Sequence, residues 1–208
     1  MNILQKYRNK NIAIYGMGIT GVSAAKIFKK LNAKVYCWDD TEKVRKKIKK
    51  LNFKVNKFWL NQEPTDKIVI SPGIDINKCK LKKYLKKNYK KIITDLDLFF
   101  EINKNATIIS ITGTNGKSTT CKIIEKILKT AGFKTKTVGN IGSPILFSKN
   151  SQKKTIFILE ISSYQLAYSR PIRTKHAAIL NITPDHLERH KNMRNYIKTK
   201  FKLFLAQR

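Results

Sequence analysis

One stretch of this sequence limits the possible folds more than any other. An apolar run at 106–111 leads into a glycine-rich turn at 113–116, then into Lys117, Ser118 and a helical pattern at 121–129. A strand, a glycine-rich turn and a helix in succession are typical of a phosphate-binding loop, in which backbone N–H groups and the helix dipole face the phosphates. In such a loop Lys117 would reach the β- and γ-phosphates of a nucleotide, and the Ser118 hydroxyl would bind Mg²⁺.

The spacing of this loop departs from the usual pattern. The early glycine would fall at Ile111, whereas here Gly113 lies three residues before Gly116. The alternative interpretation is a strand–turn–helix corner whose glycines only make the turn. We favour the phosphate loop, because a Lys-Ser pair directly after the last glycine has no packing rationale.

Strands and helices alternate along the whole chain, which predicts an α/β fold with parallel sheets and helices on both faces. The first unit is expected to be Rossmann-like and the second to be an incomplete P-loop ATPase-type α/β domain. The polar break at 103–105 predicts the boundary, so that the domains are residues 1–103 and 104–208. Strands are expected at 11–15, 34–38, 67–70, 91–94, 106–111, 135–138, 155–159 and 176–181, and helices of the first unit at 22–31, 43–51, 77–90 and 96–102.

A second glycine motif, Gly16-x-Gly18-x-x-Gly21, lies between a predicted strand and helix, and Asp39 ends the next strand. This pattern satisfies the dinucleotide-binding fingerprint and would suggest NAD. Its geometry, however, requires only a diphosphate at a helix N-terminus and a ribose hydroxyl at the acid, which any nucleoside diphosphate provides. The motif therefore predicts a diphosphate with a sugar attached. Tight strand–helix packing is the alternative role for these glycines.

Polar side chains follow two strands of the second unit. Glu160 ends the apolar run 156–159, and His186 follows the apolar run 177–180. Because parallel strands bring their carboxyl ends to one edge of a sheet, we expect both residues at the edge that carries Lys117. Glu160 suits Mg²⁺, which prefers a few carboxylates together with phosphate oxygens and water. Singly, Glu160 could be a helix cap and His186 a core histidine, but the shared edge favours a site.

The net charge of +31 suggests a nucleic-acid partner at first sight. The lysines are spread over the whole length, however, and Lys, Asn and Ile are abundant together, as a low-GC genome would produce. No basic motif interleaved with aromatic residues is present. We therefore expect no specific nucleic-acid partner, although the positive field favours anionic substrates. A nucleic-acid binder would instead bind random duplex with a steep salt dependence.

Composition also bears on the compartment. Cys37, Cys79 and Cys121 are scattered without a C-x-x-C pair, which is typical of reduced cysteines in the cytosol. No apolar stretch is long enough to cross a bilayer, and the N-terminus lacks the apolar core of a secretory signal. We expect a cytoplasmic protein without a membrane partner, and a monomer.

Five segments, in order, resemble the Mur ligases of peptidoglycan synthesis. The similarity is greatest to the members that add D-glutamate, and it extends over nearly the whole chain. The most specific parts are 160–165 and 185–190. The segments are 113–118, 139–142, 159–166, 181–190 and 196–200, and residues 16–21, 71–73 and 94–99 fit the same members.

This resemblance implies ATP-dependent amide ligation with Mg²⁺. ATP would phosphorylate the carboxylate of UDP-N-acetylmuramoyl-L-alanine, and the amine of D-glutamate would attack the acyl phosphate. The implied ATP-binding residues are Gly113, Thr114, Asn115, Gly116, Lys117, Ser118 and Thr119. The implied substrate-binding residues are Gly16, Ile19, Thr20, Asp39 and Ser71 for the uridine diphosphate and Asn140 and His186 for the muramoyl-alanine end.

The resemblance also implies the metal ligands and the catalytic residues. Lys200 matches a lysine that is carbamylated in this family, and the neighbouring Lys198 is the alternative for that role. Carbamylation would make Lys200 an anion able to bind a second Mg²⁺ beside His186. The metal ligands would be Ser118, Glu160, His186 and carbamylated Lys200, and the catalytic residues Lys117, His186 and Lys200.

The family has a third, C-terminal domain that closes over ATP and contacts D-glutamate. We therefore expect the chain to be a partial enzyme, with an incomplete central domain, and to be inactive alone. Three other interpretations stay open. The chain could be a non-catalytic nucleotide-binding fragment, another Mur-type amide ligase, or a member of a related group such as folylpolyglutamate synthetase, which fits the N-terminal glycine motif less well.

Overall fold

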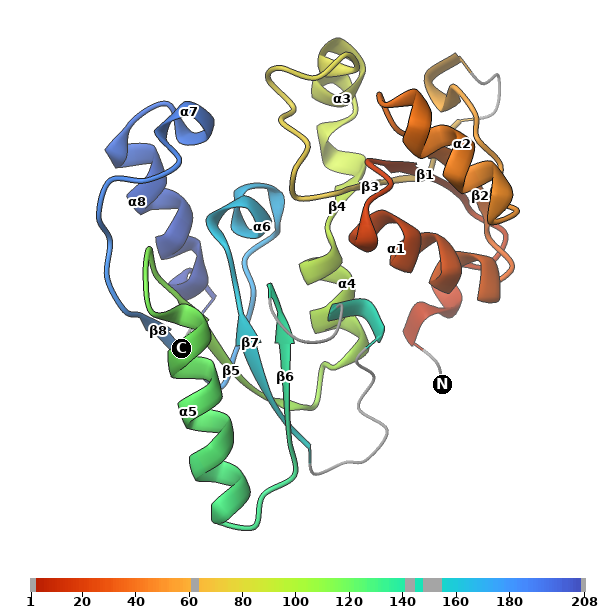
Figure 1. Cartoon of the computed structure of the whole chain (residues 1–208). Coiled ribbons are helices and arrows are strands. Elements are labelled where there is room, and N and C mark those ends of the chain that lie inside the picture. The colour runs from red at the N-terminus through yellow and green to blue at the C-terminus, as the bar shows by residue number, and fades with distance from the viewer. Residues whose placement is uncertain (1–2, 61–63, 141–144, 148–154, 207–208) are drawn as a thin grey trace. The chain divides into compact units, whose positions relative to one another are not determined.

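The computed structural model describes residues 3–60, 64–140, 145–147 and 155–206 (Figure 1). The chain divides into two compact units, Met1–Leu98 and Phe99–Arg208. The division falls within helix α4 (Asp95–Ile102), and the boundary proposed from the sequence, after residue 103, lies just beyond the end of the same helix.

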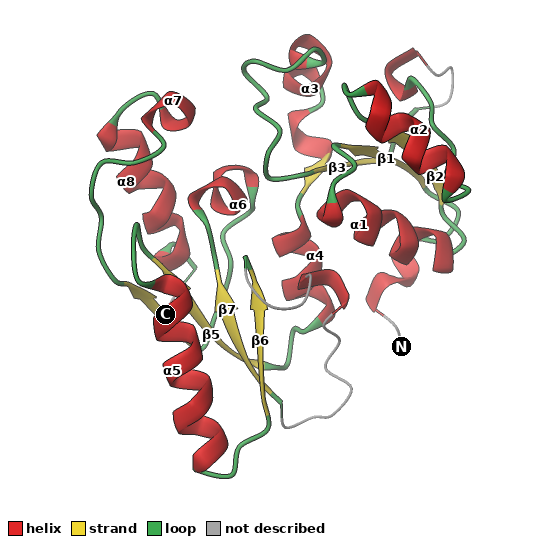
Figure 2. Cartoon of the chain, viewed as in Figure 1, coloured by secondary structure: helices red, strands yellow, loops and turns green. Residues whose placement is uncertain are grey.

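The first unit contains a four-stranded parallel sheet with the strand order β2-β1-β3-β4 (Figure 2). Its central strands are almost continuous runs of buried apolar residues, as expected of a parallel sheet covered on both faces. The strands are β1 (Asn11–Tyr15), β2 (Lys34–Trp38), β3 (Lys67–Ile70) and β4 (Ile92–Ile93), and the remaining helices are α1 (Ile19–Lys30), α2 (Glu42–Lys50) and α3 (Lys82–Lys87).

The predicted helix at 77–90 is the main difference from the sequence analysis. Only α3 is α-helical there, and it is followed by a 3₁₀ turn at Tyr89–Lys91. The preceding residues form a turn instead, because the Asp75 carboxylate accepts a hydrogen bond from the backbone N–H of Asn77 at 2.8 Å. Such local side-chain bonds compete with a helix.

The second unit contains a four-stranded parallel sheet with the strand order β6-β7-β5-β8. Helix α5 packs against β5, β6 and β7, while α8 packs against α6 and α7. The strands are β5 (Thr107–Thr112), β6 (Thr135–Gly139), β7 (Ile156–Glu160) and β8 (His176–Ile179), and the helices are α5 (Lys117–Thr130), α6 (Ser163–Tyr168), α7 (Leu187–His190) and α8 (Met193–Phe201). The predicted α/β class and both parallel sheets are confirmed.

Two expectations from composition can be compared with the structure. Cys37, Cys79 and Cys121 are all free, and burial raises the pKa of the Cys37 and Cys121 thiols to about 12. Among the described residues, every helix is too short or too polar to cross a bilayer.

Short 3₁₀ helices complete the fold at Ile3–Tyr7, Phe58–Leu60, Ile145–Phe147 and Lys202–Phe204.

Candidate functional site

The glycine-rich turn at 113–116 joins β5 to α5, as the sequence predicts. Gly116 has a φ of +79°, a left-handed conformation that favours glycine, and it is the N-cap of α5. The first bond of the helix runs from the Thr120 N–H to the Gly116 carbonyl at 2.9 Å, and no side chain caps the helix start. The backbone N–H groups of Lys117, Ser118 and Thr119 therefore have no partner within the helix and can bind an anion.

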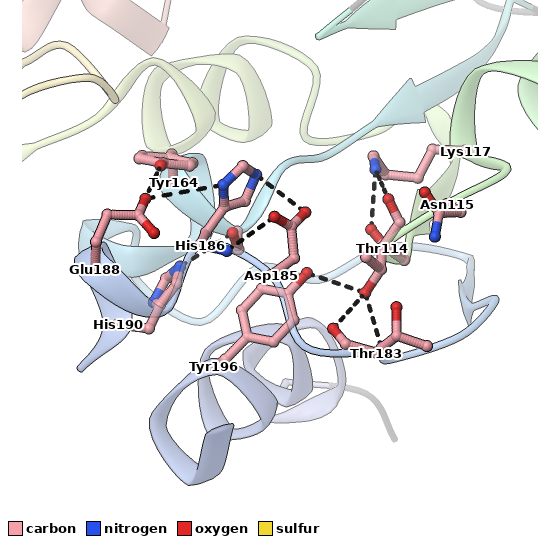
Figure 3. Close-up of polar contacts among 12 residues, drawn as sticks. Thr114, Asn115, Lys117, Tyr164, Thr183, Asp185, His186, Glu188, His190 and Tyr196 are labelled. Carbon is pink, nitrogen blue, oxygen red and sulfur yellow. Dashed lines mark hydrogen bonds and ion pairs between the residues drawn. The ribbon is translucent and has the colours of Figure 1, made fainter. Parts of the chain in front are cut away.

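Two lysines converge on this loop. The Lys117 ammonium donates to the carbonyls of Thr114 at 2.7 Å and Gly113 at 3.0 Å (Figure 3). The ammonium of Lys200, on α8, donates to the same Gly113 carbonyl at 2.8 Å. Two positive charges thus lie beside one oxygen, where a polyanion would relieve their repulsion.

Lys200 is unusual because it is a buried lysine with only 1 % of its surface exposed. Burial and, to a smaller extent, the nearby charge of Lys117 lower its pKa to about 8. Its ammonium also lies 4.7 Å from the centre of the Tyr196 ring. Lys198, the alternative for the same role, is exposed. Of the two lysines, only Lys200 contacts the loop.

Glu160 forms hydrogen bonds with two other predicted site residues. The Ser118 hydroxyl donates to its Oε2 at 2.8 Å, and the Asn140 amide donates to its Oε1 at 3.1 Å. Glu160 is 1 % exposed, so these bonds compensate a carboxylate that is removed from water. A β-carbon at Gly139 would lie 2.1 Å from the Glu160 carbonyl, so glycine is needed for the close approach of β6 and β7 there. A buried carboxylate beside a hydroxyl is a donor set that fits Mg²⁺.

His186 lies in a different polar cluster (Figure 3). Its Nε2 is 3.4 Å from the Asp185 carboxylate, its Nδ1 is 4.0 Å from that of Glu188, and its ring meets that of Tyr164 edge-on at 4.9 Å. Within the described residues, no group of three or more His, Cys, Asp or Glu side chains is placed to hold a metal. No contact described for His186 joins it to Ser118, Glu160 or Lys200.

The three glycines of the first unit have three different roles. Gly16, with a φ of +87°, makes the turn after β1, and a β-carbon there would lie 2.9 Å from Ser71 and Ile74. A β-carbon at Gly21 would lie 2.1 Å from the Gly16 carbonyl, so this glycine allows helix and strand to pack closely. A β-carbon at Gly18, the N-cap of α1, would meet no atom within 4 Å. This division of roles is the one that a diphosphate-binding turn requires.

Asp39 and Ser71 both hold this turn in place. The Asp39 carboxylate accepts from the backbone N–H of Met17 at 2.8 Å, and the Ser71 hydroxyl donates to the Gly16 carbonyl at 2.6 Å. A carboxylate has further lone pairs for a ribose hydroxyl. Ile19 is 74 % exposed, and Thr20 is half-buried. The structure therefore brings Gly16, Asp39 and Ser71 together and leaves Ile19 on the surface at the start of α1.

Sequence reasoning missed two residues that contact the glycine-rich turn. Asn181 and Tyr196 both form hydrogen bonds with the loop. The available signal for Asn181 was its position two residues beyond Ile179, the last residue of β8. For Tyr196 it was the four-residue spacing to Lys200, which places both on one face of a helix.

Two family models match the chain. The MurD-like N-terminal domain of Mur ligases matches residues 10–93, and the Mur ligase middle domain matches residues 111–208. Solved structures share the fold at low identity. A ligase of Neisseria meningitides described as UDP-N-acetylmuramate:L-alanyl-gamma-D-glutamyl-meso-diaminopimelate ligase has a TM-score of 0.56 at 17 % identity, covering 93 % of this chain and 67 % of that one. The UDP-N-acetylmuramate–alanine ligase of Thermotoga maritima has a TM-score of 0.55 at 18 % identity, covering 95 % and 47 %.

Curated relatives are more similar in sequence. UDP-N-acetylmuramoylalanine–D-glutamate ligases of Wolbachia pipientis and Rickettsia bellii are each 41 % identical, over 96 % and 95 % of this chain and 40 % and 44 % of their own lengths. The chain thus spans less than half the length of these relatives. With both family models covering nearly all of it, the chain belongs to the Mur ligase family, of which it carries the MurD-like N-terminal domain and the middle domain.

Proposed function

We propose that the protein containing this chain joins D-glutamate to UDP-N-acetylmuramoyl-L-alanine in peptidoglycan synthesis, using ATP and Mg²⁺ and an acyl-phosphate intermediate. Two observations at the phosphate loop carry the proposal. The Lys117 ammonium contacts the loop backbone, and Ser118 and Asn140 both form hydrogen bonds with the Glu160 carboxylate. The curated relatives with this substrate specificity support the choice of amine and acceptor. We expect the reaction to take place in the cytoplasm.

The loop residues would bind and orient the triphosphate of ATP. Lys117 would leave its carbonyl partners and neutralise charge on the β- and γ-phosphates, and the free N–H groups of Ser118 and Thr119 would donate to phosphate oxygens. Ser118 and Glu160 would hold Mg²⁺, with Asn140 fixing the second oxygen of the carboxylate. When bound, the ion would stabilise the charge that develops during phosphoryl transfer.

Lys200 would act as a carbamate. The lone pair of a neutral lysine amine attacks the carbon of CO₂, an N–C bond forms, one C–O π bond opens, and the nitrogen loses a proton to solvent. The burial of Lys200 and its lowered pKa support this assignment over Lys198, because only the neutral amine reacts. The neutral amine would thereby become an anion able to bind a metal ion, for which the family resemblance implies His186 as a partner ligand.

In the first unit, the turn at Gly16 and Gly18 would bind the diphosphate of the UDP-sugar, and Asp39 would bind the ribose. The same geometry would accept NAD, so a binding measurement is needed to distinguish NAD from the UDP-sugar as the ligand. A calorimetric titration should show binding of UDP-N-acetylmuramoyl-L-alanine and none of NAD. The reverse result would overturn the assignment of this unit.

The reaction is tested with the protein at the full length of its relatives. Phosphate release should require ATP, Mg²⁺, UDP-N-acetylmuramoyl-L-alanine and D-glutamate together, and mass spectrometry should identify the amide. Release with another amino acid in place of D-glutamate would show a different Mur-type ligase. The 208 residues by themselves span less than half the length of the relatives, and we expect them to bind nucleotide without forming the amide.

A further inference from the structure

Asn181 lies where the ends of two neighbouring strands meet the phosphate loop. Strands β5 and β8 are paired up to Thr112 and Ile179, and the Leu180 N–H extends the ladder by donating to the Thr112 carbonyl at 2.9 Å. The Thr114 N–H then reaches the Asn181 carbonyl at 3.1 Å. Asn181, which follows the paired part of β8, therefore faces the loop that follows β5.

Both ends of the Asn181 side-chain amide form hydrogen bonds with the loop backbone. Its Oδ1 accepts from the N–H groups of Asn115 at 2.9 Å and Thr114 at 3.1 Å, and its Nδ2 donates to the Asn115 carbonyl at 3.1 Å. The opposite amide orientation would place an NH₂ group against two N–H donors, so the network fixes the assignment. The Asn181 side chain thus pairs with both the N–H and the carbonyl of Asn115.

A second anchor ties the loop to the same segment. The Thr114 hydroxyl accepts from the Thr183 N–H at 3.0 Å and contacts the Thr183 carbonyl at 3.2 Å and the Tyr196 hydroxyl at 3.1 Å (Figure 3). Two residues of the 181–183 segment therefore hold two consecutive residues of the loop. The shape of the loop depends on this segment as well as on its own glycines.

These contacts divide the N–H donors of the loop into two sets. Those of Thr114 and Asn115 are used by Asn181, whereas those of Lys117, Ser118 and Thr119 have no partner within the helix. We infer that Asn181 is a positioning residue. It fixes residues 114 and 115 so that the N–H groups of residues 117–119 meet the phosphates of a nucleoside triphosphate. This inference rests on the proposed function, because it assumes that the loop binds ATP.

The test is a calorimetric titration of the 208-residue chain with MgATP and, separately, with magnesium tripolyphosphate. Asn181→Ala should raise the Kd for both ligands by about tenfold or more, because binding must then order the loop backbone. The stoichiometry should not change. Tripolyphosphate carries no base or ribose, so an equal loss for both ligands locates the effect at the phosphates.

Asn192→Ala is the matched control. Asn192 caps α8 by accepting from the Asn195 N–H at 2.9 Å and has no described contact with the loop, so its loss should leave both Kd values unchanged. A merely structural role for Asn181 predicts fewer binding sites with an unchanged Kd, and that result would overturn the inference. If Asn181→Ala does not fold, Asn181→Ser, which keeps one acceptor, should give an intermediate Kd, and a wild-type Kd would overturn the inference equally. Failure of the wild-type chain to bind either ligand would overturn the proposed ATP site itself, and the inference with it.

Discussion

Lys200→Met should stabilise the chain at pH 7, although it removes a residue to which we assign a catalytic role. Burial lowers the pKa of Lys200 to about 8 from its ordinary 10.5, so the folded chain holds this proton less tightly than the unfolded chain does. Each pKa unit corresponds to about 1.4 kcal/mol, so burying the charged form costs about 3 kcal/mol. The hydrogen bond to Gly113 that methionine forfeits contributes about 1 kcal/mol. The net gain should be about 2 kcal/mol.

The pH dependence has a definite sign. Between pH 8 and 10.5 the unfolded chain binds more protons at this lysine than the folded chain does, so wild-type stability rises with pH in that window. Methionine does not titrate, and the advantage of Lys200→Met should fall by about 3 kcal/mol from pH 8 to 10.5. Below pH 8 the advantage should be constant.

The measurement is urea unfolding, followed by circular dichroism, of wild type and variant from pH 7 to 10.5. The buffers should contain EDTA and no CO₂, so that neither metal nor carbamate forms. Lys198→Met is the control, since this exposed lysine on the same helix should give a difference near zero at every pH. A stability difference for Lys200→Met that does not change with pH would refute the reasoning, since the cost would then not come from the charge.

The remaining predictions concern the phosphate loop, the metal and the glycine turn. Lys117→Ala should weaken MgATP binding by about a hundredfold in calorimetry, because the charge-assisted contact of the ammonium with the phosphates is lost. Unchanged affinity in a folded variant would remove Lys117 from the site. Glu160→Gln should raise the Mg²⁺ concentration needed for half-maximal ATP binding by about tenfold. Glu125→Gln, which alters the half-buried carboxylate that pairs with Lys129 on α5, should not. Equal effects would indicate a general loss of negative charge. Gly21→Ala should destabilise the first unit by about 3 kcal/mol in urea unfolding, because the added β-carbon would lie 2.1 Å from the Gly16 carbonyl. Gly18→Ala should have a small effect, because the added β-carbon would meet no atom within 4 Å. Similar losses for the two variants would contradict the separate roles of these glycines.

The sheets and both glycine turns could be predicted from the sequence because they depend on local pattern. Apolar runs of four to six residues between glycine and polar breaks locate the strands of a parallel sheet whatever surrounds them. The contact of Ser118 with Glu160 was also accessible, since Glu160 ends one strand, Ser118 follows the turn after another, and the two strands end at the same edge of the sheet. The helix at 77–90 was overestimated because the lysine-rich pattern does not reveal the turn made by Asp75.

The role of Asn181 could not be derived from local pattern. It forms hydrogen bonds with Thr114 and Asn115, which lie 67 and 66 positions earlier in the chain. The residue spacing within either segment does not indicate that the two segments contact each other. The choice of Lys200 over Lys198 was different, because it came from the family resemblance of the 196–200 segment. What periodicity could not supply there was the burial that distinguishes the two lysines chemically.

The position of β5 between β7 and β8 has a consequence for the order in which the protein assembles. Thr112 pairs with Ile179, so the central strand acquires its second neighbour only after most of the second unit has been synthesised. Pairings between such distant residues form slowly, since the entropy of closing a long segment must be overcome first. A nascent chain that has produced Gly113 to Thr119 therefore has the glycine-rich turn and the start of α5 long before it has the strand that gives the turn its shape. Nucleotide capture should mark a late stage of folding and stabilise the sheet only once β8 is in place.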